Sequence, residues 1–288
     1  MKLLVFGKIG QVATELQRLA GAGLHVEALP QERADLTQPE ECASLIAQTN
    51  ADAVINAAAY TAVDRAEEEE ALAMLINATA PEAMARACAD KGVPFLHIST
   101  DYVFDGSGDA AWTTQDATGP INAYGRSKLA GDQAVLAAGG NAAILRTSWV
   151  FSAHGTNFVK TMLRLADTHD ALTVVGDQIG GPTPAADIAA ALVSMARAMV
   201  DGQQGGLYHF SGQPAASWAN FAREIFRQAS RDVTVTDIPT DAYPTPAKRP
   251  LNSRLDCSKL EEDFGISPPD WTRGLAQVLN DLKQGSRL

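Results

Sequence analysis

The first half of the chain alternates short apolar runs with stretches in which apolar residues recur every three or four positions. The runs are typical of buried strands in a parallel sheet, and they lie at residues 3–6, 24–29, 53–55, 93–98 and 143–147. The intervening stretches predict helices at residues 11–19, 67–90 and 122–138. Thr37 lies three residues before Glu40, the spacing of a capping box, so we expect another helix to begin there. Pro81 interrupts residues 67–90, which form either one long helix or two.

Strands that alternate with helices of about 10–15 residues predict βαβ crossovers. The expected fold class is therefore α/β, a doubly wound parallel sheet of the Rossmann type, and residues 1–150 are assigned to a dinucleotide-binding domain. Later in the chain the sequence breaks sharply at residues 180–184 and has fewer strand–helix repeats, although residues 185–200 and 218–229 look helical. We expect residues 151–288 to form mainly a smaller, interleaved substrate-binding region, with some segments returning to the Rossmann domain.

The charge balance limits the classes of partner. The 288 residues include 34 acidic and 23 basic side chains, giving a formal net charge of −11, which argues against a nucleic-acid partner. No apolar stretch is long enough to cross a membrane, and the N-terminal run is too short for a signal peptide. We therefore expect a cytoplasmic protein with no membrane partner and with reduced cysteines. The glutamate run at residues 67–70 is interpreted as a solvated helix face.

Two glycines follow the first predicted strand and suggest a cofactor turn. Gly7 can make the tight turn, and Gly10 lets the backbone approach a pyrophosphate at the N-terminus of the next helix. An ordinary strand-to-helix turn would also explain this pair. Ala13 stands where such motifs often have a third glycine, and alanine is still small enough for close packing of the helix on the strand.

The third predicted strand ends in small residues that leave room for a ligand in the crevice beside it: Ala57, Ala58 and Ala59. Tight packing of the strand end is the alternative. The end of the second strand offers no aspartate for the ribose 2′-hydroxyl of NAD, whereas Arg33 can meet the 2′-phosphate of NADPH. We therefore favour NADPH, with NADH possible because Glu32 opposes a phosphate.

Tyr124 and Lys128 are four residues apart at the start of a predicted helix and share one face. A nearby ammonium lowers the pKa of a phenol from its usual value of about 10, so the pair can act as a general acid or base. Such a pair alone is often a surface coincidence. Thr100, however, follows the fourth strand at the same sheet edge as the glycine turn, and its hydroxyl can bind a carbonyl oxygen that is being reduced.

Six segments together resemble one family over nearly the whole chain: residues 7–12, 56–64, 99–106, 124–131, 146–151 and 249–255. By these segments the chain is similar to the dTDP-4-dehydrorhamnose reductase family of the extended short-chain dehydrogenase/reductase superfamily. Residues 56–64 and 99–106 separate this family from the sugar epimerases better than the Tyr-x-x-x-Lys pair does.

The resemblance implies that NADPH or NADH delivers a hydride to C4 of dTDP-4-dehydro-L-rhamnose, giving dTDP-L-rhamnose. It implies that Tyr124 donates the proton, Lys128 binds the nicotinamide ribose and Thr100 polarises the keto group. With the glycine turn and Arg33, the cofactor set is Gly7, Gly10, Gln11, Val12, Arg33, Asp35, Leu36, Ala57, Ala58, Ala59, Tyr60, Thr61, Tyr124 and Lys128. The residues implied for the nucleotide-sugar are Thr100, Asp101, Tyr102, Trp149, Asn157 and Arg249.

Two of these residues could instead serve the stability of the fold rather than bind the substrate. Trp149 offers a stacking face, but it is equally a candidate core tryptophan. Arg249 offers a bidentate fork for phosphate, but a surface ion pair would also account for it.

Two departures from the family pattern concern metal and assembly. Some members bind magnesium at a dimer interface through glutamates, and Glu15 matches one such position, but Ala186 stands at another, beside Asp187. This argues against a magnesium site and leaves a monomer or a homodimer. HxxH, HExxH and CxxC patterns do not occur, so no catalytic zinc is expected. The alternative functions are an epimerase or dehydratase of the same superfamily, or a non-catalytic regulatory subunit like the methionine adenosyltransferase β subunit.

Overall fold

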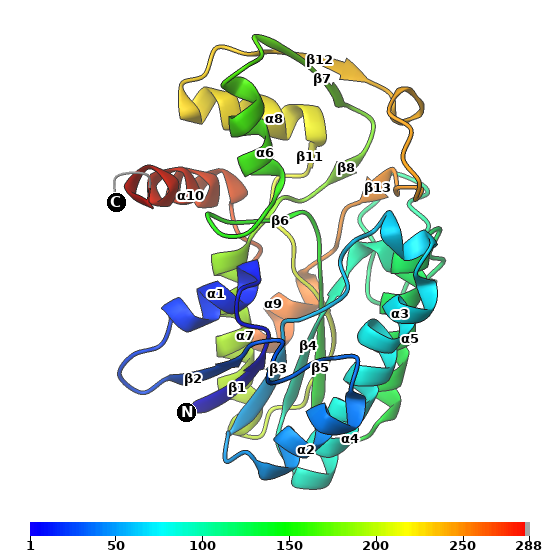
Figure 1. The fold of residues 1–288 in the computed structure, drawn as a ribbon, viewed down its shortest axis with the longest axis vertical. Helices are drawn as coiled ribbons and strands as arrows, with labels where there is room; N and C mark the ends of the chain where they lie inside the picture. The colour runs from blue at the N-terminus through cyan, green and yellow to red at the C-terminus, as the bar shows by residue number, and fades with distance from the viewer. Residues whose placement is uncertain (286–288) are drawn as a thin grey trace.

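The computed structural model describes residues 1–285, and a parallel β-sheet forms its centre (Figure 1). Within this range the sheet contains, in spatial order, β2 (His25–Leu29), β1 (Lys2–Phe6), β3 (Ala53–Asn56), β4 (Phe95–Thr100), β5 (Ala142–Thr147) and β10 (Gly206–His209). Every neighbouring pair is parallel. The strand order reverses at β1, as in a doubly wound sheet. The α/β fold class and the five strands predicted in the first half are confirmed, with ends shifted by two residues at most.

The strand side chains alternate between two hydrophobic cores, one on each face of the sheet, because successive side chains of a strand point to opposite sides. Leu3 and Val5 belong to one core, and Leu4 and Phe6 to the other. The first face is covered by α1 (Gln11–Arg18), α7 (Ala185–Val200) and α9 (Ser258–Phe264). The second face is covered by α2 (Pro39–Gln48), α4 (Ala80–Lys91) and α5 (Ala123–Ala137).

Helix α2 begins at Pro39, so the predicted capping box at Thr37 is wrong. Proline is favoured in the first helical turn because an N–H there would have no intrahelical partner. The N–H of Thr37 instead donates to Asp35 Oδ1 at 2.9 Å, which holds the bend before the helix.

The predicted helical segment 67–90 is interrupted, as expected, but the interruption precedes Pro81. The short helices η1 (Arg65–Glu67) and α3 (Glu70–Met74) lead into a π-helical turn, η2 (Leu75–Thr79), and α4 then starts with Pro81 in its first turn. Such π turns insert an extra residue into a helix and often lie at functional sites.

Asn77 in the π-helical turn fastens the end of β3 to α5. Its Oδ1 accepts from the Tyr60 N–H at 2.8 Å, and its Nδ2 donates to the Tyr60 carbonyl at 3.0 Å and to Ser127 Oγ at 2.9 Å. The backbones approach so closely here that a Cβ at Gly131 would lie 2.0 Å from the Asn77 carbonyl oxygen. Glycine is therefore required at this point of α5.

The second half of the chain contributes to both parts of the molecule. Strand β10 and helices α7 and α9 lie on the central sheet, and the other elements form a smaller lobe at the top of Figure 1. These are β6 (Val150–Phe151), α6 (Phe158–Ala166), β7 (Ala171–Val175), β8 (Ile179–Gly180), β9 (Thr183–Pro184), β11 (Ala216–Ser217), α8 (Trp218–Ala229), β12 (Thr234–Ile238), β13 (Asn252–Ser253) and α10 (Trp271–Gly285), with η4 (Thr240–Ala242) in a connection. The short helix η3 (Asp101–Val103) instead follows β4 of the central sheet directly.

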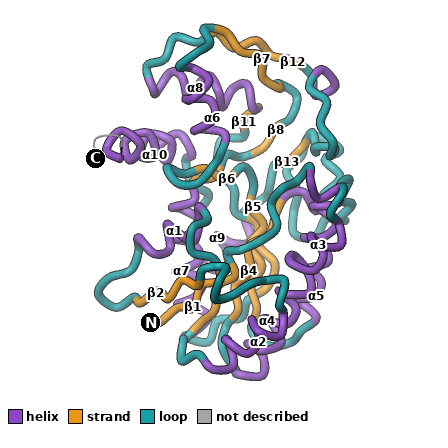
Figure 2. Tube along the Cα trace, in the orientation of Figure 1, coloured by secondary structure: helices purple, strands orange, loops and turns teal. Residues whose placement is uncertain are grey.

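The small lobe has its own core, to which Phe151, Phe221 and Trp271 contribute. Its strands form one three-stranded sheet, β11-β8-β13, and the pairs β12-β7 and β6-β9, and long loops join them (Figure 2). Helices α7 and α8 have the predicted bounds, whereas α6, α9, α10 and the short strands were not predicted. Within residues 1–285, no helix is long and apolar enough to cross a membrane.

We expect Gly131→Ala to lower the free energy of unfolding by about 1–3 kcal/mol, because the added methyl group overpacks the contact with Asn77. Urea unfolding measures the change. The control is Gly21→Ala, where the Cβ points into open space and the effect should stay within about 0.5 kcal/mol. Equal stability of the two variants would contradict the close approach of α5 and η2.

Candidate active site

A groove of about 850 Å³ runs along the carboxyl ends of the central strands, where the strand order reverses. In doubly wound sheets this is where ligands bind. All the residues predicted for the cofactor line the groove except Arg33, and the residues predicted for the substrate that line it are Thr100, Asp101, Tyr102 and Trp149. Arg33, Asn157 and Arg249 are engaged elsewhere, as described below.

The glycine turn has the geometry that a cofactor turn requires. Gly7 has a φ of 104°, and a Cβ there would lie 3.3 Å from the Ala57 carbonyl oxygen, so both its conformation and its surroundings favour glycine. Gly10 is the N-cap of α1, and Ala13 is buried against the sheet. The free N–H groups at the start of α1 therefore face the groove and can bind an anion without a basic side chain.

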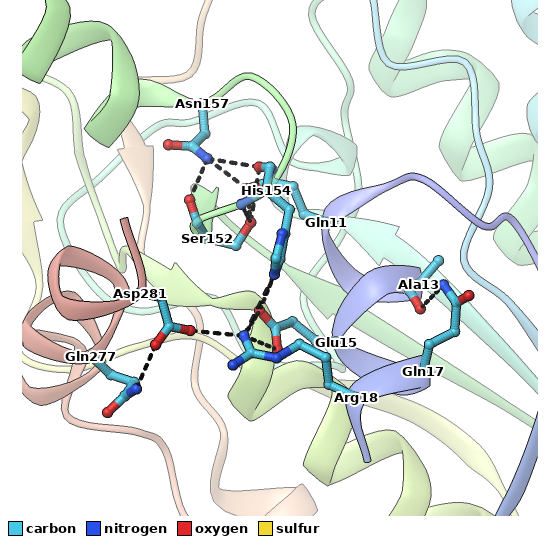
Figure 3. A network of polar contacts seen from close by, with 10 residues as sticks. All are labelled: Gln11, Ala13, Glu15, Gln17, Arg18, Ser152, His154, Asn157, Gln277 and Asp281. Carbon is cyan, nitrogen blue, oxygen red and sulfur yellow. Dashed lines mark hydrogen bonds and ion pairs between the residues drawn. The ribbon is translucent and has the colours of Figure 1, made fainter. Parts of the chain in front are cut away.

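The side chain of Gln11 fastens this turn to the loop that leads into α6 (Figure 3). Its Oε1 accepts from Ser152 Oγ and from Asn157 Nδ2, both at 2.9 Å, and its Nε2 donates to the Val150 carbonyl at 3.3 Å. Asn157 is also the N-cap of α6, since its Oδ1 accepts from the Lys160 N–H. The structure thus places Asn157 in a structural contact behind the turn.

The carboxylate of Glu15 is engaged within the chain. Glu15 pairs with Arg18 at 3.2 Å and with His154 at 3.3 Å, and Arg18 also contacts Asp281 at 2.8 Å (Figure 3). A guanidinium therefore already lies between the two carboxylates. Among the described residues, no cluster of His, Cys, Asp or Glu has an arrangement that could hold a metal ion.

Thr100, Tyr124 and Lys128 meet on one wall of the groove, as the sequence predicts. The Thr100 side chain lies beside Tyr124 and acts to lower the pKa of its phenol, while the Thr100 hydroxyl donates to Asp101. Lys128 Nζ donates to the Ile98 carbonyl at 2.8 Å and lies 3.2 Å from His97 Nε2. Asn122 caps α5 by accepting from the Gly125 N–H at 2.7 Å, so the helix that carries both catalytic candidates starts at a defined residue.

Burial, rather than the lysine charge, dominates the protonation of this pair. It raises the pKa of Tyr124, with the Thr100 side chain acting in the opposite direction, and it lowers the pKa of Lys128 to about 8. The expectation that Lys128 depresses the tyrosine pKa is therefore wrong for this structure, because burial disfavours both charged forms. At neutral pH Tyr124 is a phenol and can act as an acid.

Asp101 and Tyr102 complete this wall. Thr100 Oγ1 donates to Asp101 Oδ1 at 3.1 Å, and burial raises the pKa of Asp101 to about 6. The Tyr102 ring meets the edge of the Tyr124 ring, with centroids 5.5 Å apart. A buried carboxyl group that is easily protonated can either accept or donate a hydrogen bond to a hydroxylated ligand.

Trp149 lies between the groove and the aromatic residues of the small lobe. It has a φ of 48°, which is rare for a bulky residue, and its ring stacks on Trp218 with centroids 3.6 Å apart. A Cβ at Gly180 would lie 2.8 Å from the Trp149 ring. The ring is therefore fixed in place, with part of its surface on the groove.

Arg249 forms a bidentate pair with Asp64, at 2.6 and 2.8 Å, and also donates to the Ala247 carbonyl. The hydrogen bond from Arg249 holds the pKa of Asp64 below its usual value. This pair connects the loop after β3 to the segment before β13. Asp64 lies within a segment singled out in the sequence, but nothing there indicated its partner 185 residues later.

Arg33 does not line the groove, and its Nη1 lies 3.6 Å from Oε1 of Glu27 on β2. Glu32 lines the groove instead. The glutamate run at 67–70 is only partly a solvated face: Glu67 accepts from the Ala123 N–H at the start of α5, and Glu70 pairs with Arg126. A carboxylate at a helix N-terminus stabilises the helix.

A buried ion pair fixes α5 to the sheet. Asp132 Oδ2 and Arg146 Nε are 2.9 Å apart, and their side chains are 1% and 4% exposed. The Arg146 guanidinium also lies over the Phe104 ring, 5.3 Å from its centroid. Like the contacts of Lys128, this ion pair helps to fix the distance between α5 and strands β4 and β5.

Comparison with known proteins matches this geometry to one family. The model of the RmlD substrate binding domain family matches residues 1–284. The chain belongs to this family. A dTDP-4-dehydrorhamnose reductase of Sinorhizobium fredii is 48% identical over 286 residues, covering 97% of each chain.

Solved structures of family members superpose over nearly the whole chain. A dTDP-4-dehydrorhamnose reductase of Clostridium acetobutylicum has a TM-score of 0.92 and 38% identity, covering 98% of this chain and 100% of its own. One from Bacillus anthracis, in complex with NADP, has a TM-score of 0.91 and 33% identity, covering 97% and 99%.

We expect Asp132→Asn to lower the free energy of unfolding by about 3–5 kcal/mol, since it leaves the Arg146 charge buried without its partner. Denaturant titration measures this. Glu82→Gln is the matched control, because it neutralises one partner of the exposed Glu82–Arg86 pair and should change stability by less than about 1 kcal/mol. A loss at Asp132 no larger than at Glu82 would refute the role of the buried pair.

Proposed function

We propose that this protein is an NAD(P)H-dependent oxidoreductase that reduces the C4 keto group of dTDP-4-dehydro-L-rhamnose to give dTDP-L-rhamnose. The observation that carries the proposal is the meeting of Thr100, Tyr124 and Lys128 on the wall of a groove that begins at the glycine turn. The family membership and the names of its relatives support the same reaction.

The groove residues fit a bound nicotinamide dinucleotide. The N-terminus of α1 at Gly10 would hold the pyrophosphate, Asp35 and Leu36 would flank the adenine, and Lys128 would bind the nicotinamide ribose. A nicotinamide held there supplies the hydride. The structure of the Bacillus anthracis relative in complex with NADP supports a cofactor of this class.

The protein's own groups account for the proton. Tyr124 is held as a phenol by burial and donates to the oxygen that develops negative charge at C4. The Thr100 hydroxyl, which donates to Asp101 in this structure, would turn its proton to the same oxygen and so polarise the keto group. Lys128, with a pKa of about 8, carries a proton at neutral pH that can restore the phenol after each turnover.

The remaining groups would bind the nucleotide-sugar. Asp101, Tyr102 and Trp149 lie on the groove beside the reacting centre. Arg249, in the segment before β13, would bind the diphosphate by exchanging its bidentate contact with Asp64 for phosphate oxygens. Asn157 would act indirectly, through its contact with Gln11.

The direct test is steady-state oxidation of NADPH, followed by the loss of its absorbance, with and without the 4-keto-6-deoxy sugar nucleotide. We expect oxidation only when the sugar nucleotide is present. Tyr124→Phe should lower kcat by roughly 100- to 10,000-fold, because the proton donor is removed, while NADPH binding stays within about twofold.

Tyr208→Phe is the control for loss of a phenol hydroxyl, because Tyr208 bonds to Asp263, does not line the groove and should keep wild-type turnover. Substrate binding by the wild type without any NADPH oxidation would refute the reductase. Undiminished turnover in Tyr124→Phe would refute only the role of the tyrosine.

The position of Arg33 leads to a prediction about the cofactor. Removing the charge of its partner in Glu27→Gln should free the guanidinium for a 2′-phosphate and lower the KM for NADPH about two- to fivefold, with little change for NADH. Glu40→Gln on α2 makes the same charge change at an exposed site and serves as the control. An equal change in the two KM values would show that Arg33 does not distinguish the cofactors.

A further inference from the structure

His97 is a buried titratable side chain that the proposed mechanism does not use. It lies in β4 with no exposed surface, directly opposite Asn56 on β3 and Ile144 on β5. Its ring joins two polar groups: Nδ1 lies 3.2 Å from Asn56 Nδ2, and Nε2 lies 3.2 Å from Lys128 Nζ. Burial, with the Lys128 charge, lowers the pKa of His97 well below its usual value, so the ring is neutral.

The orientation of Asn56 determines which ring nitrogen carries the proton. The Oδ1 of Asn56 accepts from the Ala58 N–H at 3.2 Å, so its amide nitrogen must face the histidine. An amide nitrogen only donates, and His97 Nδ1 therefore accepts and carries no proton. Rotating the Asn56 amide by about 180° would place its Nδ2 opposite the Ala58 N–H, so two donors would face each other. The Ala58 N–H would then have no acceptor, which is costly for a buried group.

The proton of a neutral imidazole must then be on Nε2, directed at the Lys128 amino group. An ammonium group has no lone pair and cannot accept this N–H, whereas a neutral amine can. The contact therefore favours the neutral amine over the ammonium. Lys128 keeps its donor bond to the Ile98 carbonyl in either state.

We propose that His97 is a positioning residue that donates its Nε2–H to Lys128, stabilises the neutral amine and so makes Lys128 a readier proton donor to Tyr124. This inference rests on the proposed reduction, in which Tyr124 must regain a proton in every turnover. This hydrogen-bond chain begins at Asn56, whose side chain is held by the backbone at the end of β3. It affects the reaction only through Lys128.

The other charged groups near Lys128 do not substitute for this effect. Asp132, one turn further along α5, favours the ammonium and is itself paired with Arg146. Burial acts in the same direction as His97. Tyr124 stays uncharged at neutral pH, and the Lys128 charge is the one that acts on His97. His97 is thus the hydrogen-bonding partner that distinguishes the two states of the lysine.

The first experiment reads the tautomer of wild-type His97 directly and needs no substrate. In protein labelled with ¹⁵N-histidine, long-range ¹H–¹⁵N spectra distinguish a protonated from an unprotonated ring nitrogen, and the signal absent from His97→Asn identifies His97 among the five histidines. We expect a proton on Nε2 and not on Nδ1, with no titration between about pH 6 and 9. A proton on Nδ1 would overturn the proposal.

The second experiment compares two variants that each keep one half of the imidazole. The amide of His97→Asn reaches the place of Nδ1 and can still accept from Asn56, but it leaves nothing at the place of Nε2. The amide of His97→Gln reaches the place of Nε2 and can still donate to Lys128. Phenylalanine or leucine would remove both halves and would not separate them.

The readout is the pH dependence of kcat with NADPH and the 4-keto sugar nucleotide, whose alkaline limb we assign to loss of the Lys128 proton at a pKa of about 8. In His97→Asn the limb should move to higher pH by roughly 0.5–1 unit, because the group that favoured the neutral amine is gone. In His97→Gln it should stay near the wild type.

An unchanged limb in His97→Asn, or one moved to lower pH, would overturn the proposal, the latter by showing that His97 accepts from the ammonium. If the wild type does not oxidise NADPH, the proposed reduction fails, and the tautomer spectrum still decides what His97 presents to Lys128. Should His97→Asn not fold, the signal absent from His97→Gln identifies His97 instead. The wild-type tautomer and the limb of His97→Gln then decide the question, and a shifted limb in that variant counts against the proposal.

Discussion

The close packing of α5 against the short helix η3 after β4 and against the π-helical turn η2 determines where each group of the proposed reaction lies. Backbone meets backbone at two points: a Cβ at Gly125 would lie 2.2 Å from the Tyr102 carbonyl oxygen, and one at Gly131 would lie 2.0 Å from that of Asn77. Tyr124 and Lys128 are carried by this part of the helix and are pressed into the groove wall. Their burial follows from that packing, and burial is what keeps Tyr124 a phenol and lowers the pKa of Lys128.

The same packing explains how a chain with a net charge of −11 can bind anionic ligands. Several acidic residues in and around the groove have a partner or a weakened charge, although Glu32 also lines it. Asp64 is paired with Arg249, Glu67 bonds to the N-terminus of α5, and burial raises the pKa of Asp101 to about 6. The N-terminus of α1 remains free to face the groove, so the local field there differs in sign from the overall charge.

Patterns of apolar residues within about twenty neighbouring positions were sufficient to predict the central sheet and most of the helices that flank it. The apolar runs indicated the strands, and the periodic stretches indicated α1, α5, α7 and α8. A helix that buries one face must carry an apolar residue every three or four positions, so the pattern is visible in the sequence. Thr37 failed as a cap because the proline two residues later was a stronger start signal. The small lobe was not predicted, because strands of two residues such as β8 are held by partners distant in sequence rather than by their own pattern.

The site was harder to predict from the sequence, because its side chains contact residues that are distant in the chain. Some of these contacts follow from the strand register once the strands are aligned. Phe6 lies opposite Asn56, Asn56 opposite His97, and His97 opposite Ile144. Asn56 ends β3, whereas His97 lies three residues before the end of β4, so the distance from a strand end does not reveal their contact. The observed register identifies the Asn56–His97 pair. It does not identify the Asp64–Arg249 pair, because both residues lie in loops whose paths depend on how the whole small lobe packs.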